Sequence, residues 1–295
     1  MALNFSIFRT RAITALVFAA IMLLGLLWNQ WSFLILFSVI HFGCWYEYQR
    51  LVGRIDPGYT TITIFHRYGV MLAGWCIMLY FTNDLYYLGG ISLRDIGYWG
   101  GLILLFVLPT LEILFLQKLR LKNIAHSTFG LLYISLSLGL LVNLGSIKGP
   151  FYKGPLNFID RLPVLLIIGS LWINDTMAYI MGSLIGRTSL SPISPKKTWE
   201  GTIAGIILSV IVMGLIGYFV ITEFDWDTIV QWMIIAAIAS IAGTIGDLLQ
   251  SKLKRLANVK DSGHIMPGHG GFLDRFDSLL FATPFVWLYV QLFAK

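Results

Sequence analysis

A polar, glycine-rich stretch near the end of the sequence, SGHIMPGHGGFLDRFDS at residues 262–278, contains the residue types that bind phosphate and metal. His269 is flanked by glycines, which can adopt left-handed backbone and let the main chain approach a ligand closely. Asp274 and Asp277 follow at positions i and i+3, where a helix places both carboxylates on one side. The stretch predicts a site for phosphate and a divalent cation, and helix capping by Asp274 is the structural alternative.

A second set of candidate residues lies on one face of a predicted helix, in the segment GTIGDLLQSKLKRL. Asp247, Ser251 and Lys254 stand at positions i, i+4 and i+7, and Arg255 flanks them. A salt bridge from Asp247 to Lys254 within the helix would span two turns, which is farther than the usual i+4 pair. A cation bound by the acid, with phosphates bound by the basic residues, explains this order better.

A pair of lysines, Lys196 and Lys197, lies in the predicted loop RTSLSPISPKKTWEGT, just before another predicted helix. Thr198 is suited to cap that helix, and Glu200 is suited to the dipole of its first turn. The two lysines are therefore expected near a helix N-terminus, where phosphate oxygens bind readily. Binding of lipid headgroups by an interfacial lysine pair is the alternative.

An acidic residue, Asp175, lies near the middle of the apolar segment LWINDTMAYIMGSLIGR. An ionised side chain in that position costs at least ~2.5–3.5 kcal/mol unless it faces a cavity or a cation. A hydrogen bond between helices through Asn174 or Thr176 is the structural alternative. Asp175, Asp247 and Asp274 are expected to converge near the inner membrane face. Because Mg²⁺ prefers one or two carboxylates together with phosphates and waters, two such cations could clamp a phosphoryl centre there.

The composition places these residues in a membrane protein. The chain has 295 residues, of which 57% are hydrophobic and only 12% charged, so it has too little polar surface to cover a soluble globule. The net charge of +6 is spread over several loops, and the sequence lacks a soluble domain with a groove, which argues against a nucleic-acid partner. Cys44 and Cys76 fall in apolar runs, so neither a disulfide framework nor a thiolate metal site is expected.

The elements that must position the candidate residues are membrane-spanning helices. Runs of about 20 apolar residues predict an all-α, polytopic membrane protein with about nine transmembrane helices. The runs are 11–28, 31–50, 65–82, 96–116, 124–144, 163–186, 200–221, 229–250 and 276–293. With the N-terminus in the cytoplasm and the C-terminus outside, sixteen of the 21 basic residues fall on the cytoplasmic side, as the positive-inside rule requires.

The chain divides by function into two parts of a single integrated membrane domain. Residues 1–160 are expected to form scaffold helices, and residues 161–295 the catalytic region, because the acids, the lysine pair and the glycine-rich stretch lie there. The small residues Gly201, Gly205 and Ser209 could pack within one chain or between two copies in a homodimer. Three histidines stand alone in or beside helices and are expected to be hydrogen-bonded residues, not metal ligands: His41, His66 and His126.

The C-terminal residues resemble the signature of the integral-membrane phosphatidate cytidylyltransferases, also called CDP-diglyceride synthases. The family's pattern S-x-x-K-R, four residues, K-D, then P-x-H-G-G, x-x-D-R and D is met by Ser251, Lys254, Arg255, Lys260, Asp261, Pro267, His269, Gly270, Gly271, Asp274, Arg275 and Asp277. The segments NDTMAYIMG and SPKKTWEG resemble the two upstream motifs of the family. The resemblance covers about residues 160–290.

The resemblance implies that phosphatidate and CTP react to give CDP-diacylglycerol and pyrophosphate, with Mg²⁺ and a second, monovalent cation such as K⁺. It implies a multi-pass protein of the bacterial inner membrane, in contact with membrane lipids, whose active site faces the cytoplasm. The predicted catalytic residues are Asp247, Asp274, Lys254, Arg255 and His269, the last for positioning or proton handling. The predicted substrate-phosphate ligands are Lys196, Lys197, Ser251, Lys260, Gly270, Gly271 and Arg275. The predicted metal ligands are Asp247 and Asp274, followed by Asp175 and Asp277.

Two other functions stay open at this stage. A CTP-dependent polyprenol or dolichol kinase would use the same nucleotide but transfer the γ-phosphate and release CDP. An ion transporter with Asp175 and Asp247 as a midplane site would predict inverted repeats and broken helices in both halves. The polar residues of this sequence instead cluster in one half, which argues against the transporter.

Overall fold

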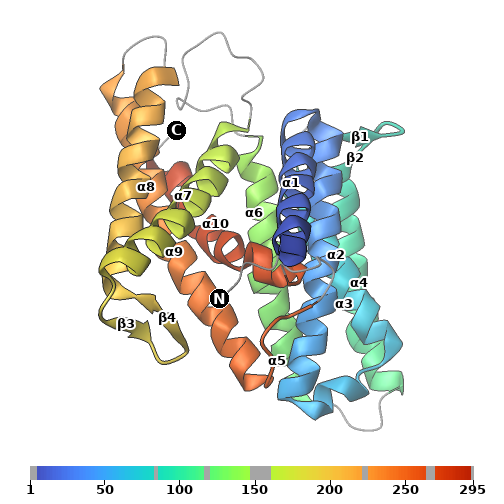
Figure 1. Cartoon of the computed structure of the whole chain (residues 1–295). Helices are drawn as coiled ribbons and strands as arrows, with labels where there is room; N and C mark the ends of the chain where they lie inside the picture. Colours follow the sequence, from blue (N-terminus) through green and yellow to red (C-terminus); the bar gives the residue numbers. More distant parts are fainter. Residues whose placement is uncertain are drawn as a thin grey trace. The chain divides into compact units, whose positions relative to one another are not determined.

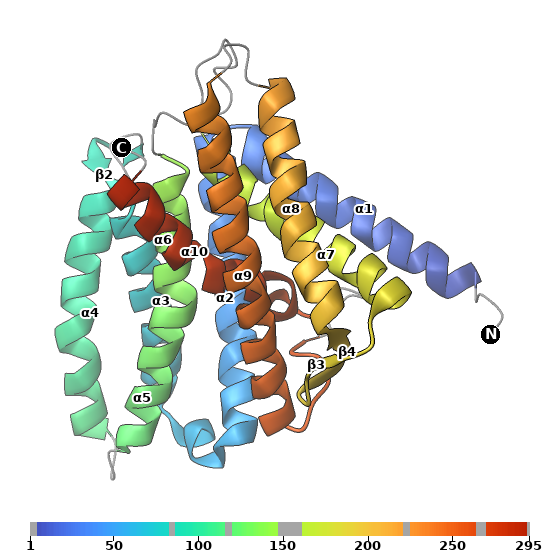
Figure 2. The same cartoon turned by 90° about the vertical axis from the view of Figure 1, so that its left-hand side faces the viewer.

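The computed structural model describes residues 5–82, 86–115, 120–146, 161–220, 225–263 and 270–293, and it describes side chains from residue 13 onward. These residues are mainly helical (Figures 1 and 2). Each of the predicted apolar runs coincides, within a few residues, with a helix or a continuous helical segment in this part of the chain. The all-α prediction is therefore confirmed, apart from two short antiparallel hairpins.

Six helical segments of the described residues are long and apolar enough to cross a membrane. They are α4 (Leu93–Phe115), the continuous α5–η2–α6 segment (Leu121–Leu144), α7 (Leu162–Ile185), α8 (Trp199–Val220), α9 (Trp226–Leu256) and α10 (Phe272–Phe293). The helices α1 (Phe5–Leu27), α2 (Gln30–Ile55) and α3 (Ile64–Tyr80) fall outside this set. The α3 helix has 17 residues, and the second half of α2 contains Glu47, Gln49 and Arg50. The count of nine spans remains a prediction.

The chain forms two compact units. The first contains residues Met1–Val142 and Leu253–Phe276, and the second contains Asn143–Lys252 and Asp277–Lys295. The segment around Leu253–Phe276 thus groups with the early helices, although the sequence places it among the catalytic residues. The predicted division at residue 160 is one of function and stays a prediction.

The first unit is built around α2. The side chains of Phe37, Cys44 and Trp45 on this helix are fully buried. The α3 helix lies alongside α4 (Figure 2), and it is preceded by the short helix η1 (Pro57–Thr61). The α5 (Leu121–Gly130), η2 (Leu131–Leu136) and α6 (Ser137–Leu144) helices follow one another without a break, and η2 is a turn of π-helix. The hairpin of β1 (Tyr87–Leu88) and β2 (Ile91–Ser92) precedes α4.

The isolated histidines are hydrogen-bonded residues, as predicted. His41 Nε2 lies 3.0 Å from Ser135 Oγ, and His126 Nε2 lies 3.5 Å from a carboxylate oxygen of Asp56. The backbone N–H of Gly58 also donates to Asp56 and is the largest cause of the lowered pKa of this carboxyl. Cys44 and Cys76 are buried, and neither forms a disulfide.

The small-residue face of α8 packs within the chain, in the second unit. A Cβ on Gly201 would lie 2.7 Å from Gly182 Cα of α7, and Gly205 is packed as closely against the same helix. Ser209 Oγ donates to the carbonyl oxygen of Ser170, also on α7, at 3.0 Å. The first of the two predicted packing modes is therefore observed. A homodimer remains a prediction.

A hairpin stands where the sequence predicts a loop between α7 and α8. The strands β3 (Ser189–Ser191) and β4 (Ser194–Thr198) pair antiparallel, and β4 leads directly into α8 (Figure 1). Thr198 Oγ1 accepts a hydrogen bond from the Gly201 N–H at 3.2 Å, which confirms Thr198 as the cap of α8. Glu200 accepts bonds from the backbone N–H and the hydroxyl of Thr188. The first turn of α8 therefore holds the start of the hairpin.

Candidate active site

The stripe of candidate residues on α9 forms as predicted, because α9 continues unbroken from Trp226 to Leu256. Ser251 Oγ donates to Asp247 Oδ1 at 3.3 Å, one turn away on the same helix. Within the second unit, the ammonium of Lys197 on β4 forms an ion pair with Asp247 Oδ2. The side chain of Asp247 is 28% exposed, so one side of this carboxylate remains accessible.

The lysine at the other end of the stripe pairs with a different acid, in the first unit. Lys254 Nζ donates to Asp274 Oδ1 at 2.8 Å, and both side chains are largely buried. Asp274 Oδ2 accepts two backbone hydrogen bonds, from the N–H of Ser262 at 2.8 Å and of Gly271 at 3.1 Å. Asp274 is the third residue of α10 and bonds the N–H that precedes the helix, so it caps α10. The alternative that the sequence left open for Asp274 is therefore observed.

A residue absent from the sequence-based candidates organises the same region. Glu47, on α2, is 1% exposed. It accepts hydrogen bonds from Ser262 Oγ at 2.6 Å and from the backbone N–H groups of Phe272 and Leu273 at 2.9 Å each. These partners lie up to 226 residues away in the sequence. One signal could have found Glu47, namely an acid within an apolar run, which is also what identified Asp175.

The carboxylates of Glu47 and Asp274 occupy the N-terminus of α10, which the sequence predicts as a phosphate site. The N–H groups of Phe272 and Leu273 bond Glu47, and that of Gly271 bonds Asp274, so protein carboxylates already occupy these orphan donors. Gly270 has the left-handed backbone that the sequence predicts, with φ of 84°. A Cβ on Gly271 would lie 2.2 Å from a carboxylate oxygen of Glu47. The glycine at this position therefore admits Glu47, and phosphate binding by Gly270 and Gly271 stays a prediction.

The other predicted site residues differ in their surroundings. Four predicted phosphate or catalytic ligands have exposed side chains: Lys196, Arg255, Lys260 and Arg275. Asp175 is exposed on α7, where the neighbouring Asn174 is buried and donates to Thr244 Oγ1 on α9. Asp277 is buried and accepts a bond from the Ser278 N–H at 2.7 Å. His269 lies outside the described residues.

The carboxylates differ in how well they fit a divalent cation. Among the residues that the structure describes, no three side chains of His, Cys, Asp or Glu cluster as a metal cage. Mg²⁺ is often held by one or two carboxylates with phosphates and waters, so the accessible Asp247 fits this requirement. Asp274 already bonds three donors, so a metal would have to take the place of Lys254 at Oδ1. The lysine ammonium in each ion pair marks a position where the carboxylate favours positive charge.

The sequence profile of the Cytidylyltransferase family matches residues 9–293, nearly the whole chain. The chain belongs to this family. The match extends the resemblance beyond residues 160–290, since it includes the N-terminal helices that the C-terminal signature does not cover. It confirms the family that the motifs at Ser251–Asp277 indicated.

Relatives of this cytidylyltransferase-family chain are named phosphatidate cytidylyltransferase. The Bacillus subtilis protein is 30% identical over 225 residues, which cover 76% of this chain and 78% of the relative. The Synechocystis protein is 40% identical over 156 residues, 52% of each chain. The Staphylococcus haemolyticus protein is 50% identical over 114 residues, 38% of this chain and 43% of the relative. The chain thus matches about half the length of the last two relatives.

Proposed function

We propose that this protein transfers the cytidylyl group of CTP to phosphatidate, giving CDP-diacylglycerol and pyrophosphate. The observation that carries the proposal is the similarity to the phosphatidate cytidylyltransferase of Bacillus subtilis, which covers 76% of this chain. The ion pairs around Asp247 and Asp274 support it, since each one joins a predicted metal ligand to a lysine predicted to bind phosphate or to act in catalysis.

In the proposed reaction, a phosphate oxygen of phosphatidate attacks the α-phosphorus of CTP, and the bond to the β-phosphate breaks as pyrophosphate leaves. Lys197, Lys254 and Arg255 neutralise the negative charge that develops. The phosphate monoester is itself a competent nucleophile, so no covalent enzyme intermediate is needed. His269 is assigned to positioning or proton handling.

The proposed ligands of Mg²⁺ are Asp247 and Asp274, and Asp175 and Asp277 are further candidates. A second cation, K⁺, is also proposed. When bound, the metal would neutralise negative charge on the triphosphate. The side chains of Lys197 and Lys254, which pair with these carboxylates, would bind the phosphate oxygens of the substrates.

The proposed setting is the bacterial inner membrane. The six apolar helices and the bacterial relatives support a multi-pass membrane protein. We extend this to nine spans, an N-terminus in the cytoplasm, a C-terminus outside and a cytoplasmic active site, on the distribution of the basic residues. Cytoplasmic CTP and the phosphate of a membrane lipid would meet at that interface.

The position of the radioactive label tests the reaction. The purified protein is incubated with phosphatidate, Mg²⁺ and CTP labelled at either the α- or the γ-phosphate. We expect the α-label in the lipid phase and the γ-label in pyrophosphate. A γ-label in the lipid phase with release of CDP would instead identify a lipid kinase, and ion flux in sealed vesicles without nucleotide would identify a transporter.

The two adjacent lysines of β4 are expected to differ in importance. Lys197 pairs with Asp247, whereas the side chain of Lys196 is exposed. Lys197→Met should therefore lower kcat/KM for CTP by roughly tenfold or more, because this is the effect expected from the loss of one charge-assisted hydrogen bond. Lys196→Met, as the matched control, should have a smaller effect. Equal losses in both variants would show that the ion pair with Asp247 does not distinguish the two lysines.

A further inference from the structure

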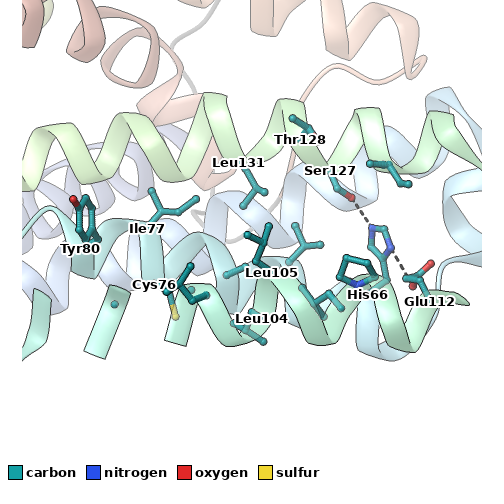
Figure 3. Close-up of a pocket in the computed structure, with 18 of the residues that line it drawn as sticks. His66, Cys76, Ile77, Tyr80, Leu104, Leu105, Glu112, Ser127, Thr128 and Leu131 are labelled. Atoms are coloured by element: carbon teal, nitrogen blue, oxygen red, sulfur yellow. Dashed lines mark hydrogen bonds and ion pairs between the residues drawn. The ribbon is translucent and has the colours of Figure 1, made fainter. Parts of the chain in front are cut away.

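A large cavity lies in the first unit, between α3, α4 and α5 (Figure 3). Its volume of about 630 Å³ is in the range of ligand-binding cavities. Most of its lining is apolar, and Ile77, Leu104, Leu105 and Leu131 are representative. None of its lining residues is a lysine or an arginine. The cavity therefore suits an uncharged, apolar ligand.

The cavity is open toward the surroundings of the helices. Both α4 and the continuous α5–η2 segment pack on α3, with little packing of α4 against α5 or η2. Leu105 and Ile113, which line the cavity from α4, are 65% and 71% exposed. Since α4 is long and apolar enough to cross a membrane, lipid is the expected medium on this side.

The length of the cavity matches a lipid tail. It extends along α3 from His66 to Tyr80, a rise of about 21 Å at 1.5 Å per residue. One leaflet of the hydrocarbon core is about 15 Å thick, half of the whole core, so an acyl chain fits lengthwise. Leu131, at the start of the π-helical turn η2, lines the cavity, and such turns are frequent at functional sites.

One end of the cavity is polar. His66 Nε2 lies 2.7 Å from Ser127 Oγ, and His66 Nδ1 lies 3.1 Å from Glu112 Oε1 (Figure 3). The hydroxyl of Thr63 donates to the same oxygen of Glu112 at 2.9 Å, and the hydroxyl of Tyr59 lies 3.0 Å from Ser127 Oγ. When the imidazole is neutral, every donor in this chain has an acceptor: the Tyr59 hydroxyl donates to Ser127, the Ser127 hydroxyl to His66 Nε2, and His66 Nδ1 to Glu112.

The ring of His66 and the hydroxyl of Ser127 are thus both used within the protein. Ser127 is buried and held by two partners, so it is poorly placed to act as a nucleophile. The contacts of Glu112 with Thr63 and His66 are both made by Oε1, which leaves Oε2 as an acceptor for a ligand. The exposed Thr128 adds a hydroxyl to the cavity wall.

We propose that this cavity binds an uncharged glycerolipid of the diacylglycerol class, with one acyl chain along α3 and its free hydroxyl donating to Glu112. The Glu112 carboxylate and the lack of a lining cation disfavour a phosphate headgroup there. The site is therefore distinct in chemistry from the proposed phosphatidate and CTP site, and it does not depend on cytidylyl transfer.

Photolabelling of the full chain in lipid nanodiscs tests the proposal. Diacylglycerol and phosphatidate probes carry the same photoactivatable acyl chain, and labelled peptides are mapped by mass spectrometry. We expect the diacylglycerol probe to label residues 93–115 about tenfold more than the phosphatidate probe. This ratio is the effect expected from one hydrogen bond to a carboxylate. Glu112→Gln should reduce that preference. Equal labelling by the two probes would overturn the proposal.

Filling the cavity provides the second test. Leu105→Trp and the milder Ala73→Leu place extra volume in the cavity and should reduce labelling by diacylglycerol to background. Phe106→Trp, on the same helix but outside the cavity lining, is the matched control and should label like the unchanged protein. Labelling that survives both filling variants, or cross-links that join two copies of the chain through these residues, would contradict a lipid in this cavity. Neither readout uses CTP, so a negative result leaves the proposed function intact.

Discussion

Replacing Asp247 by asparagine is expected to lower Mg²⁺-dependent formation of CDP-diacylglycerol at least about 100-fold, because loss of a metal ligand or of a group that stabilises the transition state has effects of this size. Asn keeps the shape of the side chain, and its amide oxygen can still accept the bond from Ser251. The charge that pairs with Lys197 is lost. The measurement is transfer of α-labelled CTP into lipid over a range of Mg²⁺ concentrations.

Asp227→Asn is the matched control for this variant. Asp227 lies on the same helix, α9, but in its first turn, at the opposite end from the stripe of candidate residues. Its side chain is exposed. We expect this variant to keep the activity of the unchanged protein. If Asp247→Asn formed labelled CDP-diacylglycerol as fast as the unchanged protein, Asp247 would have no part in the mechanism.

Replacing Glu47 by alanine is expected to destabilise the protein by about 3 kcal/mol or more. The change removes the acceptor of three donors, the hydroxyl of Ser262 and the N–H groups of Phe272 and Leu273. Each buried donor left without an acceptor costs about 1–3 kcal/mol. Stability is measured by chemical denaturation in detergent. The remaining folded protein should also show a raised KM for CTP, because these donors lie beside Asp274.

A variant of Glu112, a second buried acid of the first unit, is the control that distinguishes an effect on stability from an effect on activity. Glu112 also accepts bonds from two side chains, but these belong to Thr63 and His66 and not to the segment from Ser262 to Asp274. Glu112→Ala should therefore lower stability while leaving the KM for CTP unchanged. If Glu47→Ala and Glu112→Ala changed stability and KM alike, Glu47 would be a core residue without a positioning role.

Much of the fold was predictable from the sequence, because it depends on local chemistry. Hydrocarbon requires each spanning segment to satisfy its own backbone groups, so every long apolar run had to be a helix. The positions of Asp247, Ser251 and Lys254 on one face follow from the helical period alone. The cap of α8 by Thr198 follows from its place before the helix. The family was indicated by a long motif of specific residues, and the profile match confirmed it.

The tertiary structure alone decided the partners of these residues. Lys197 pairs with Asp247 and Lys254 with Asp274, and neither pairing can be read from the spacing within a helix. The burial of Glu47 against the start of α10 joins residues more than two hundred positions apart. An apolar run specifies a helix but not which neighbour each face will meet, since lipid and protein interiors are equally apolar. For this reason the sequence determined the helices and the candidate residues, whereas helix packing determined their counterions, the occupied N-terminus of α10 and the cavity beside α3.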